Sequence, residues 1–230
     1  MNTEKNIKTL IVKKPLKLDC GKTIKDFPIA YETYGSLNSK KDNAILVFHA
    51  LTGDQFVTGI NPITNKDGWW SYAVGPGKAI DTNKYFVICS NVIGGCMGSY
   101  GPGHKDPNNE NIFGTNFPVI TINDMVNAQY NLLDHFGIDK LFSVTGGSMG
   151  GMQVLQFISN FPNKSKTVIP IATTSSHSAQ NIAFNELGRQ AITADIDWKD
   201  GNYSSNNTNP GKGLAVARMA AHITYLSKKG

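Results

Sequence analysis

The segment from Leu141 to Phe161 constrains the fold more than any other part of the sequence. An apolar run at Leu141–Val144 leads into the turn GGSMG at Gly146–Gly150, and a helical pattern follows at once and is closed by Pro162. A strand that turns sharply into a helix is the context that gives the G-x-S-x-G pattern its meaning, because the glycines leave room for strand and helix to pack closely. The pattern predicts that Ser148 is an exposed nucleophile, and an ordinary glycine-rich turn between strand and helix is the alternative.

Apolar runs mark the other strands. A continuous apolar run is typical of a parallel strand that is buried on both faces, and four runs of this kind occur, the last at Val168–Ala172. Two earlier segments also have the pattern of strands and are separated by a turn at Gly21-Lys22. The expected strands are Thr9–Leu18, Phe27–Thr33, Ala44–Phe48, Tyr85–Cys89, Leu141–Val144 and Val168–Ala172.

Helical patterns lie between and after these runs. The strongest spans Thr121–Phe136, where Thr121 and Asp124 resemble a capping box and Gly137 is a plausible stop. Strands that alternate with helices predict an α/β chain with a mainly parallel, doubly wound sheet. The remaining helices are expected at Met149–Phe161, Ala179–Thr193 and Leu214–Ser227, the last two joined by the polar segment Asp200–Pro210.

A serine nucleophile needs hydrogen-bond donors for the developing oxyanion. The first donor is expected to be the N–H of Met149, the residue after the nucleophile. The second is expected to be the N–H of Leu51, by its position in the segment HALTG at 49–53, which follows the run Ala44–Phe48 directly. His49 precedes the nucleophile in the chain and is interpreted as a structural residue.

The partners of such a serine are harder to find. On this kind of fold the acid and then the histidine follow the nucleophile along the chain. His177 precedes every downstream acid, and His222 lies inside a helical pattern rather than on a loop. The acids after Ser148 are Glu186, Asp195, Asp197 and Asp200. The triad Asp and His are therefore expected to be absent from this chain.

Composition excludes several classes of function. The net charge of +5 comes largely from lysines between Lys5 and Lys41, without arginine, which indicates a solvated surface rather than a nucleic-acid site. The longest aliphatic run is far shorter than the roughly 18 residues that span a bilayer, and no apolar signal core is present, so no membrane partner is expected. The cysteines, Cys20, Cys89 and Cys96, fit no zinc pattern, and a cytoplasmic protein without metal is predicted.

The segment GGSMGGMQ at 146–153 resembles the signature of the homoserine O-acetyltransferase family, which has the α/β-hydrolase fold. The resemblance extends over nearly the whole chain, from about residue 10 to residue 227. Its other matching segments are His49–Gly53, Gly68–Trp70, Gly75–Asp81, Asn91–Cys96 and Gly188–Ile192.

The resemblance implies a ping-pong acyl transfer in methionine biosynthesis. Ser148 would take an acetyl group from acetyl-CoA, a co-substrate rather than a bound cofactor, and pass it to the hydroxyl of L-homoserine. Arg218 and Tyr225 match the substrate-binding pair of the family; they are seven positions apart on one predicted helix and so share a face. The family is homodimeric through its lid helices, and its partners are small molecules.

The same resemblance implies that family members continue beyond this sequence. Residues 1–176 would form the N-terminal part of the hydrolase core, with about six of eight strands, and residues 177–230 the start of an incomplete helical lid. The chain alone is then expected to be inactive, and its sheet is expected to end in an apolar edge at Val168–Ala172. The alternatives are a serine esterase or other hydrolase on the same fold, a homoserine or serine O-succinyltransferase, and a non-catalytic fragment.

Overall fold

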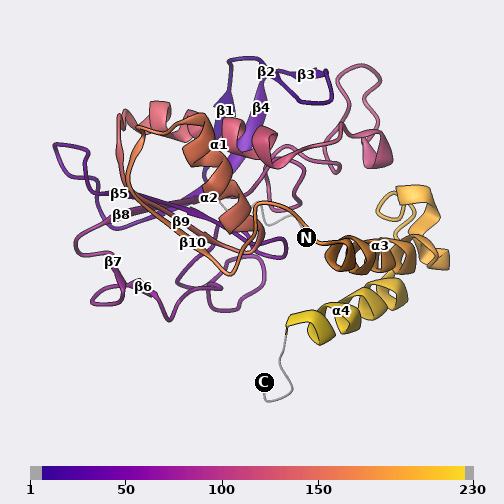
Figure 1. The fold of residues 1–230 in the computed structure, drawn as a ribbon. Coiled ribbons are helices and arrows are strands. Elements are labelled where there is room, and N and C mark those ends of the chain that lie inside the picture. Colours follow the sequence, from indigo (N-terminus) through magenta and orange to yellow (C-terminus); the bar gives the residue numbers. More distant parts are fainter. Residues whose placement is uncertain (1–6, 226–230) are drawn as a thin grey trace. The chain divides into compact units, whose positions relative to one another are not determined.

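The computed structural model describes residues 7–225, which form two compact units (Figure 1). The first unit contains the residues up to Asn111 together with Phe117–Ser175. The second contains Ile112–Asn116 and the residues from Ser176 onward. None of the helices within residues 7–225 is long and apolar enough to cross a membrane.

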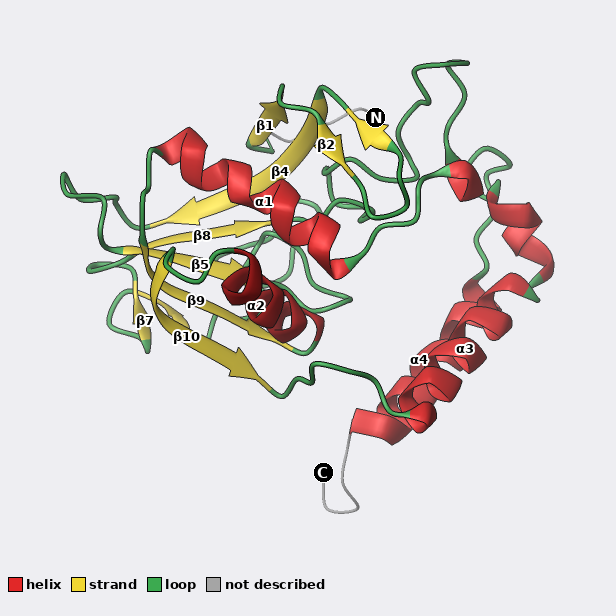
Figure 2. Cartoon of the chain, turned by 45° about the horizontal axis from the view of Figure 1, so that its top comes forward, coloured by secondary structure: helices red, strands yellow, loops and turns green. Residues whose placement is uncertain are grey.

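A six-stranded sheet forms the centre of the first unit, with the strand order β1-β4-β8-β5-β9-β10 (Figure 2). The strands β8, β5, β9 and β10 run parallel, whereas β1 pairs antiparallel with β4, and β4 with β8. The predicted mainly parallel sheet is confirmed. The six strands are β1 (Thr9–Val12), β4 (Phe27–Tyr34), β5 (Ala44–Phe48), β8 (Phe86–Ser90), β9 (Leu141–Gly147) and β10 (Ser165–Ile171).

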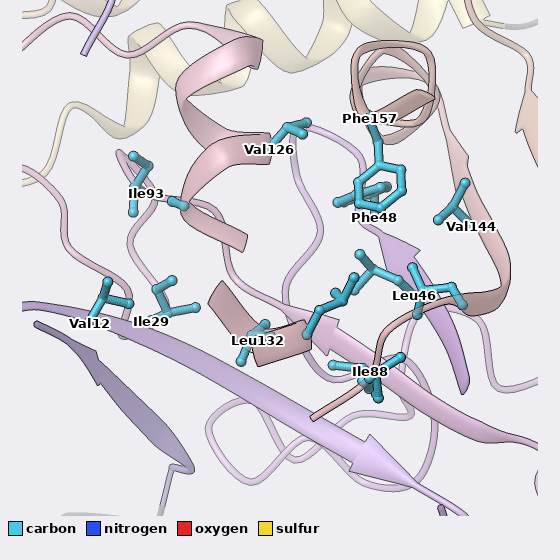
Figure 3. Close-up of a cluster of buried hydrophobic side chains, with 14 of the residues drawn as sticks. Val12, Ile29, Leu46, Phe48, Ile88, Ile93, Val126, Leu132, Val144 and Phe157 are labelled. Carbon is cyan, nitrogen blue, oxygen red and sulfur yellow. The ribbon is translucent and has the colours of Figure 1, made fainter. Parts of the chain in front are cut away.

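Two helices, α1 (Ile122–Phe136) and α2 (Met149–Asn160), pack on one face of this sheet. Figure 3 shows strand residues such as Leu46 and Phe48 among side chains of the helices, including Leu132 and Phe157. Helix α1 begins with the expected capping box, in which Thr121 and Asp124 bond each other's backbone N–H groups, and it ends at Gly137 with φ 64°. Val144 of β9 and Val154 of α2 belong to this buried cluster, so the two elements that flank Ser148 share one core.

The predicted strand Thr9–Leu18 is wrong in its extent. The chain breaks after β1, and two short strands, β2 (Leu16–Lys17) and β3 (Thr23–Ile24), pair with each other outside the main sheet. Pro15 lies at the break, where it has no N–H to donate to a ladder. A further pair of two-residue strands, β6 (Val74–Gly75) and β7 (Ile80–Asp81), follows β5.

The expectation that the last apolar run is buried on both faces is also wrong. Strand β10 lies at the edge of the sheet, and within residues 7–225 only β9 pairs with it. Its side chains are correspondingly open, with Val168 37%, Ile169 50% and Ile171 39% exposed. An apolar run shows that a strand can be buried, but it does not show which strands or helices lie against that strand. The apolar sheet edge expected at this strand is present.

The second unit is helical. Helix α3 (Ala179–Thr193) has the predicted bounds, and α4 (Gly211–Tyr225) begins three positions before the predicted Leu214. Asp195 explains the earlier start, because its carboxylate accepts a hydrogen bond from the N–H of Gly213 at 2.8 Å. The predicted helix residues 226 and 227 lie outside the described residues. Two 3₁₀ helices complete the unit, η1 (Gly114–Asn116) and η2 (Ile196–Gly201).

Candidate active site

Ser148 occupies the sharp turn between β9 and α2. Its backbone angles are φ 56° and ψ −120°, and its side chain is exposed. A positive φ is unfavourable for a residue with a Cβ and persists only where the surroundings enforce it. No described residue of the first unit makes a hydrogen bond with the Ser148 hydroxyl. The backbone therefore fixes where the Ser148 Cβ lies, and the side-chain rotamer sets the Oγ without a hydrogen bond from this unit.

The glycines around Ser148 allow backbone to pack against backbone. A Cβ placed on Gly150 would lie 2.1 Å from the carbonyl oxygen of Phe48, and one on Gly146 would lie 2.7 Å from the same atom. A Cβ on Gly147 would meet nothing closer than the Ile171 oxygen at 3.8 Å. The first and last glycines of the turn are thus required for the end of β5 to pack against the turn, whereas Gly147 is not.

The two expected oxyanion donors belong to the two segments that meet at this contact, the start of α2 and the turn after β5. Met149 is the first residue of α2, so its N–H has no carbonyl partner within the helix. Leu51 lies in the turn after β5, and its side chain is 67% exposed. The start of that turn adjoins the helix, because a Cβ on Gly150 would be 3.1 Å from the carbonyl carbon of His49. The role of both N–H groups stays a prediction.

His49 has a structural position. Its Nε2 accepts a hydrogen bond from the N–H of Val92 at 3.2 Å, and its Nδ1 lies 2.7 Å from the carbonyl oxygen of Ala50. Because Nε2 accepts, the proton of the neutral ring is on Nδ1, which donates to Ala50. Burial lowers the pKa of His49 and so disfavours the charged ring. These contacts agree with the interpretation of His49 as a structural residue.

A buried chain of polar side chains lies beneath the turn. Gln153 of α2 donates to the carbonyl oxygen of His49 at 3.3 Å and accepts a hydrogen bond from Gln129 of α1 at 2.7 Å. Gln129 in turn accepts one from Ser90 of β8 at 2.7 Å. Sequence reasoning missed this chain, although Gln129 and Gln153 stand at helix positions where apolar residues are expected. It connects both helices to the loop that carries Leu51.

The end of β10 and the residues that follow it bond the backbone of Ser148. The N–H of Ser148 donates to the carbonyl oxygen of Ile171 at 3.0 Å, and the hydroxyl of Thr173 donates to the carbonyl oxygen of Ser148 at 2.8 Å. No feature of the sequence indicated Thr173. Both hydrogen-bonding groups of the Ser148 backbone are therefore bound by residues 171–173.

The acids and histidines that follow Ser148 in the sequence all belong to the second unit. Two of the acids have structural partners there. Backbone N–H groups of Gly213 and Asp197 lower the pKa of Asp195, and the side chains of Gln190 and Arg189 lower that of Glu186. The absence of a triad Asp and His stays a prediction.

The proposed substrate-binding pair, Arg218 and Tyr225, lies on α4, and both side chains are exposed. Their role also stays a prediction. Within residues 7–225, no three His, Cys, Asp or Glu side chains are grouped so that they could hold a metal ion. The three cysteines, Cys20, Cys89 and Cys96, are free.

Two relatives match most or all of this chain in sequence. The homoserine O-acetyltransferase of Pelagibacter ubique is 73% identical over 230 residues, which are 100% of this chain and 62% of the relative. That of Nitrobacter hamburgensis is 63% identical over 214 residues, 93% of this chain and 54% of the relative. The chain thus spans between about half and two thirds of the length of these curated relatives.

Solved structures and a family model agree on the fold. The homoserine O-acetyltransferase from Bacillus anthracis has a TM-score of 0.86 and 31% identity, over 94% of this chain and 59% of its own. Esterase E22 also has a TM-score of 0.86 and 31% identity, over 96% of this chain and 62% of its own. The family model described as the alpha/beta hydrolase fold matches residues 43–229. With that match, the sheet order and the strained Ser148 between β9 and α2, the chain belongs to the alpha/beta hydrolase fold family.

Proposed function

We propose that this chain carries the nucleophile of a homoserine O-acetyltransferase, with Ser148 as the acetyl carrier. The observation that supports the proposal best is the strained turn at Ser148 in a chain that is 73% identical, along its whole length, to an enzyme of that name. The proposal includes acetyl-CoA as donor, a place in methionine biosynthesis, a cytoplasmic location and a homodimeric enzyme.

The reaction takes place in two acyl transfers. The Ser148 Oγ attacks the thioester carbonyl of acetyl-CoA, a C–O bond forms, the C–S bond breaks, and the serine proton passes through a base to the thiolate of CoA. The homoserine hydroxyl then attacks the acetyl ester, loses its proton to the base, and releases Ser148, which is reprotonated. The N–H groups of Met149 and Leu51 stabilise the oxyanion in both steps.

Recognition of the acceptor falls to α4. A guanidinium group binds a carboxylate through two parallel hydrogen bonds, which suits Arg218 to the carboxylate of homoserine. Tyr225 adds a hydroxyl and an aromatic ring two helical turns further along the same face. Neither residue would be needed by an esterase whose substrate has no carboxylate.

We expect a base for Ser148 to be the part of this reaction that residues 1–230 do not supply. A serine without its histidine is a poor nucleophile, and the loss of a triad member reduces turnover by about 10⁴ to 10⁶. We therefore expect negligible acetyl transfer from residues 1–230 alone. Homoserine-dependent release of CoA by this chain, at a rate that Ser148→Ala abolishes, would contradict that expectation.

A serine esterase is the second candidate, since esterase E22 shares the fold at 31% identity.

One experiment distinguishes an acetyltransferase from an esterase. Residues 1–230 are joined to the C-terminal part of the Pelagibacter ubique relative that this chain does not span, and CoA release is followed with acetyl-CoA or succinyl-CoA, with and without homoserine. The expected result is acetyl-CoA consumption with formation of O-acetylhomoserine, both abolished by Ser148→Ala. CoA release with free acetate as the main product would identify a hydrolase, and activity that survives Ser148→Ala would refute the proposed nucleophile.

A further inference from the structure

We infer that Thr173 is a positioning residue for Ser148. The Thr173 hydroxyl and the Ile171 carbonyl oxygen together hold the strained backbone of Ser148. The inference rests on the proposed role of Ser148 as nucleophile. It adds a residue whose hydroxyl bonds the Ser148 carbonyl oxygen rather than the Ser148 hydroxyl, and which therefore acts through the serine backbone.

The contacts bind both peptide groups of Ser148. Its N–H donates to the Ile171 oxygen at 3.0 Å. Its carbonyl oxygen accepts two hydrogen bonds, one from the N–H of Met152 at 3.1 Å and one from the Thr173 hydroxyl at 2.8 Å. A carbonyl oxygen has two lone pairs, so the two donors together satisfy it. The Met152 contact is the ordinary first bond of helix α2, whereas the Thr173 contact comes from outside the helix.

Strain makes the second donor important. Ser148 keeps φ 56° and ψ −120° although it has a Cβ, and such a conformation is stable only when several contacts enforce it. Because no described residue of the first unit bonds the Ser148 hydroxyl, a change in these two angles would move the Oγ with nothing to restrain it. The Thr173 hydroxyl fixes the carbonyl that sets ψ.

The segment after β10 is itself shaped for this contact. Ala172 has φ 45°, a second strained residue with a Cβ, and it lies between the two residues that bind Ser148. Gly151 leaves space for Thr173, since a Cβ on Gly151 would be 2.5 Å from the Thr173 Cβ and 2.8 Å from its Oγ1. The glycine after the G-x-S-x-G pattern is therefore explained by Thr173.

A matched control lies on the same strand pair. The hydroxyl of Thr167 donates to the carbonyl oxygen of Phe142 at 2.9 Å, so it also connects β10 to the backbone of β9. It lies towards the opposite end of β10 from Ser148. A purely structural effect of losing such a hydroxyl should be similar for Thr167→Val and Thr173→Val.

The test is nuclear magnetic resonance of the isotope-labelled chain, residues 1–230, which needs no activity. We expect Thr173→Val to change the Cα and Cβ chemical shifts of Ser148 and to speed exchange of its amide hydrogen about five-fold, the effect of one lost hydrogen bond. Thr173→Ser should restore both signals, and Thr167→Val should leave them as in the parent chain. Unchanged Ser148 signals in Thr173→Val would overturn the inference, as would an equal change in Thr167→Val.

The pair Thr173→Ala and Thr173→Ser covers the case in which valine does not fit, because these variants differ only in the hydroxyl. Ser148 signals that agree between this pair would overturn the inference, and signals that differ in the expected direction would support it. If both Val and Ala variants fail to fold while Ser folds, the hydroxyl is needed for the fold itself and the positioning role is wrong. If Ser148→Ala has no effect on acetyl transfer by the joined protein described above, the proposed nucleophile is refuted and these spectra of residues 1–230 stay as they are.

Discussion

The substitution Gly150→Ala tests directly how the turn at Ser148 is built. The added methyl carbon would lie 2.1 Å from the carbonyl oxygen of Phe48 and 2.8 Å from its carbonyl carbon. Real Cβ contacts do not come below 3.0 Å, so the end of β5 and the start of α2 must separate by roughly 1 Å. Both atoms that obstruct the methyl group belong to the backbone of a central strand, and no side chain can rotate away to relieve the contact.

Overpacking of this kind costs about 1–3 kcal/mol when side chains can adjust, and the upper end applies here because only backbone can move. With a typical urea slope of about 2 kcal/mol per molar for a protein of this size, a loss of about 3 kcal/mol lowers the unfolding midpoint by about 1.5 M. Gly147→Ala is the matched control. Its methyl carbon would be 3.8 Å from the nearest atom, and its φ is outside the left-handed region. Its effect should stay within about 0.5 kcal/mol of the parent, or be slightly stabilising because alanine restricts the unfolded chain.

Tryptophan fluorescence in urea gives the measurement. Trp69 and Trp70 stack on each other in the first unit, and Trp198 is the one tryptophan of the second. In a Trp198→Phe background the signal therefore reports on the unit that contains Ser148. A midpoint for Gly150→Ala that matches the parent would refute the reasoning, and so would an equal loss in Gly147→Ala.

Three further outcomes are expected. Gln153→Ala should reduce the free energy of unfolding by about 1–3 kcal/mol, because it removes the acceptor of one of the two N–H groups of the buried Gln129 amide. A loss under about 0.5 kcal/mol in urea unfolding would contradict this. Burial lowers the pKa of His49, so the contribution of its neutral ring to stability is complete above the unfolded pKa of about 6.5 and is lost as the pH falls below that value. His49→Gln should therefore flatten the dependence of the free energy of unfolding on pH between about pH 7.5 and about pH 5.5. A dependence as steep as that of the parent chain would contradict this. An exposed apolar edge strand invites pairing with a second chain, so residues 1–230 are expected to self-associate through β10. Ile169→Lys should weaken this association in sedimentation velocity, whereas Val119→Lys, at an exposed loop residue, should not; a parent chain that stays monomeric at high concentration would contradict this.

Local sequence patterns predicted the elements well wherever the determining contacts are close in the chain. Helix α1 is a good example, because its cap at Thr121 and its stop at Gly137 depend on neighbouring residues only. The turn at Ser148 was predictable for the same reason, since glycines at fixed offsets from the serine report a backbone that must pack closely. The break at Pro15 was equally local and could have been predicted from the missing N–H.

The parts that the sequence did not predict depend on neighbours far away in the chain. The exposure of β10 depends on which strands lie beside it and on what covers the two faces to which its side chains point, and an apolar run carries no such information. Gln129 and Gln153 are compatible with burial only because Ser90 and the His49 carbonyl are present to bond them. A glutamine at an apolar helix position is a detectable signal, but its partner cannot be found without the fold.

The proposed role of Ser148 as a nucleophile has two requirements, which are its position and its activation. Position is complete within the first unit: β5 packs under the turn through Gly150, Gln153 bonds the loop of His49, and Thr173 binds the serine carbonyl. Activation requires a base, and the described part of the first unit offers the Ser148 hydroxyl no hydrogen-bond partner. Because the backbone contacts do not involve the hydroxyl, they hold Ser148 strained whether or not a base is present. The position of Ser148 can therefore be measured in this chain by itself, and its proposed reactivity can be measured separately once a base is supplied.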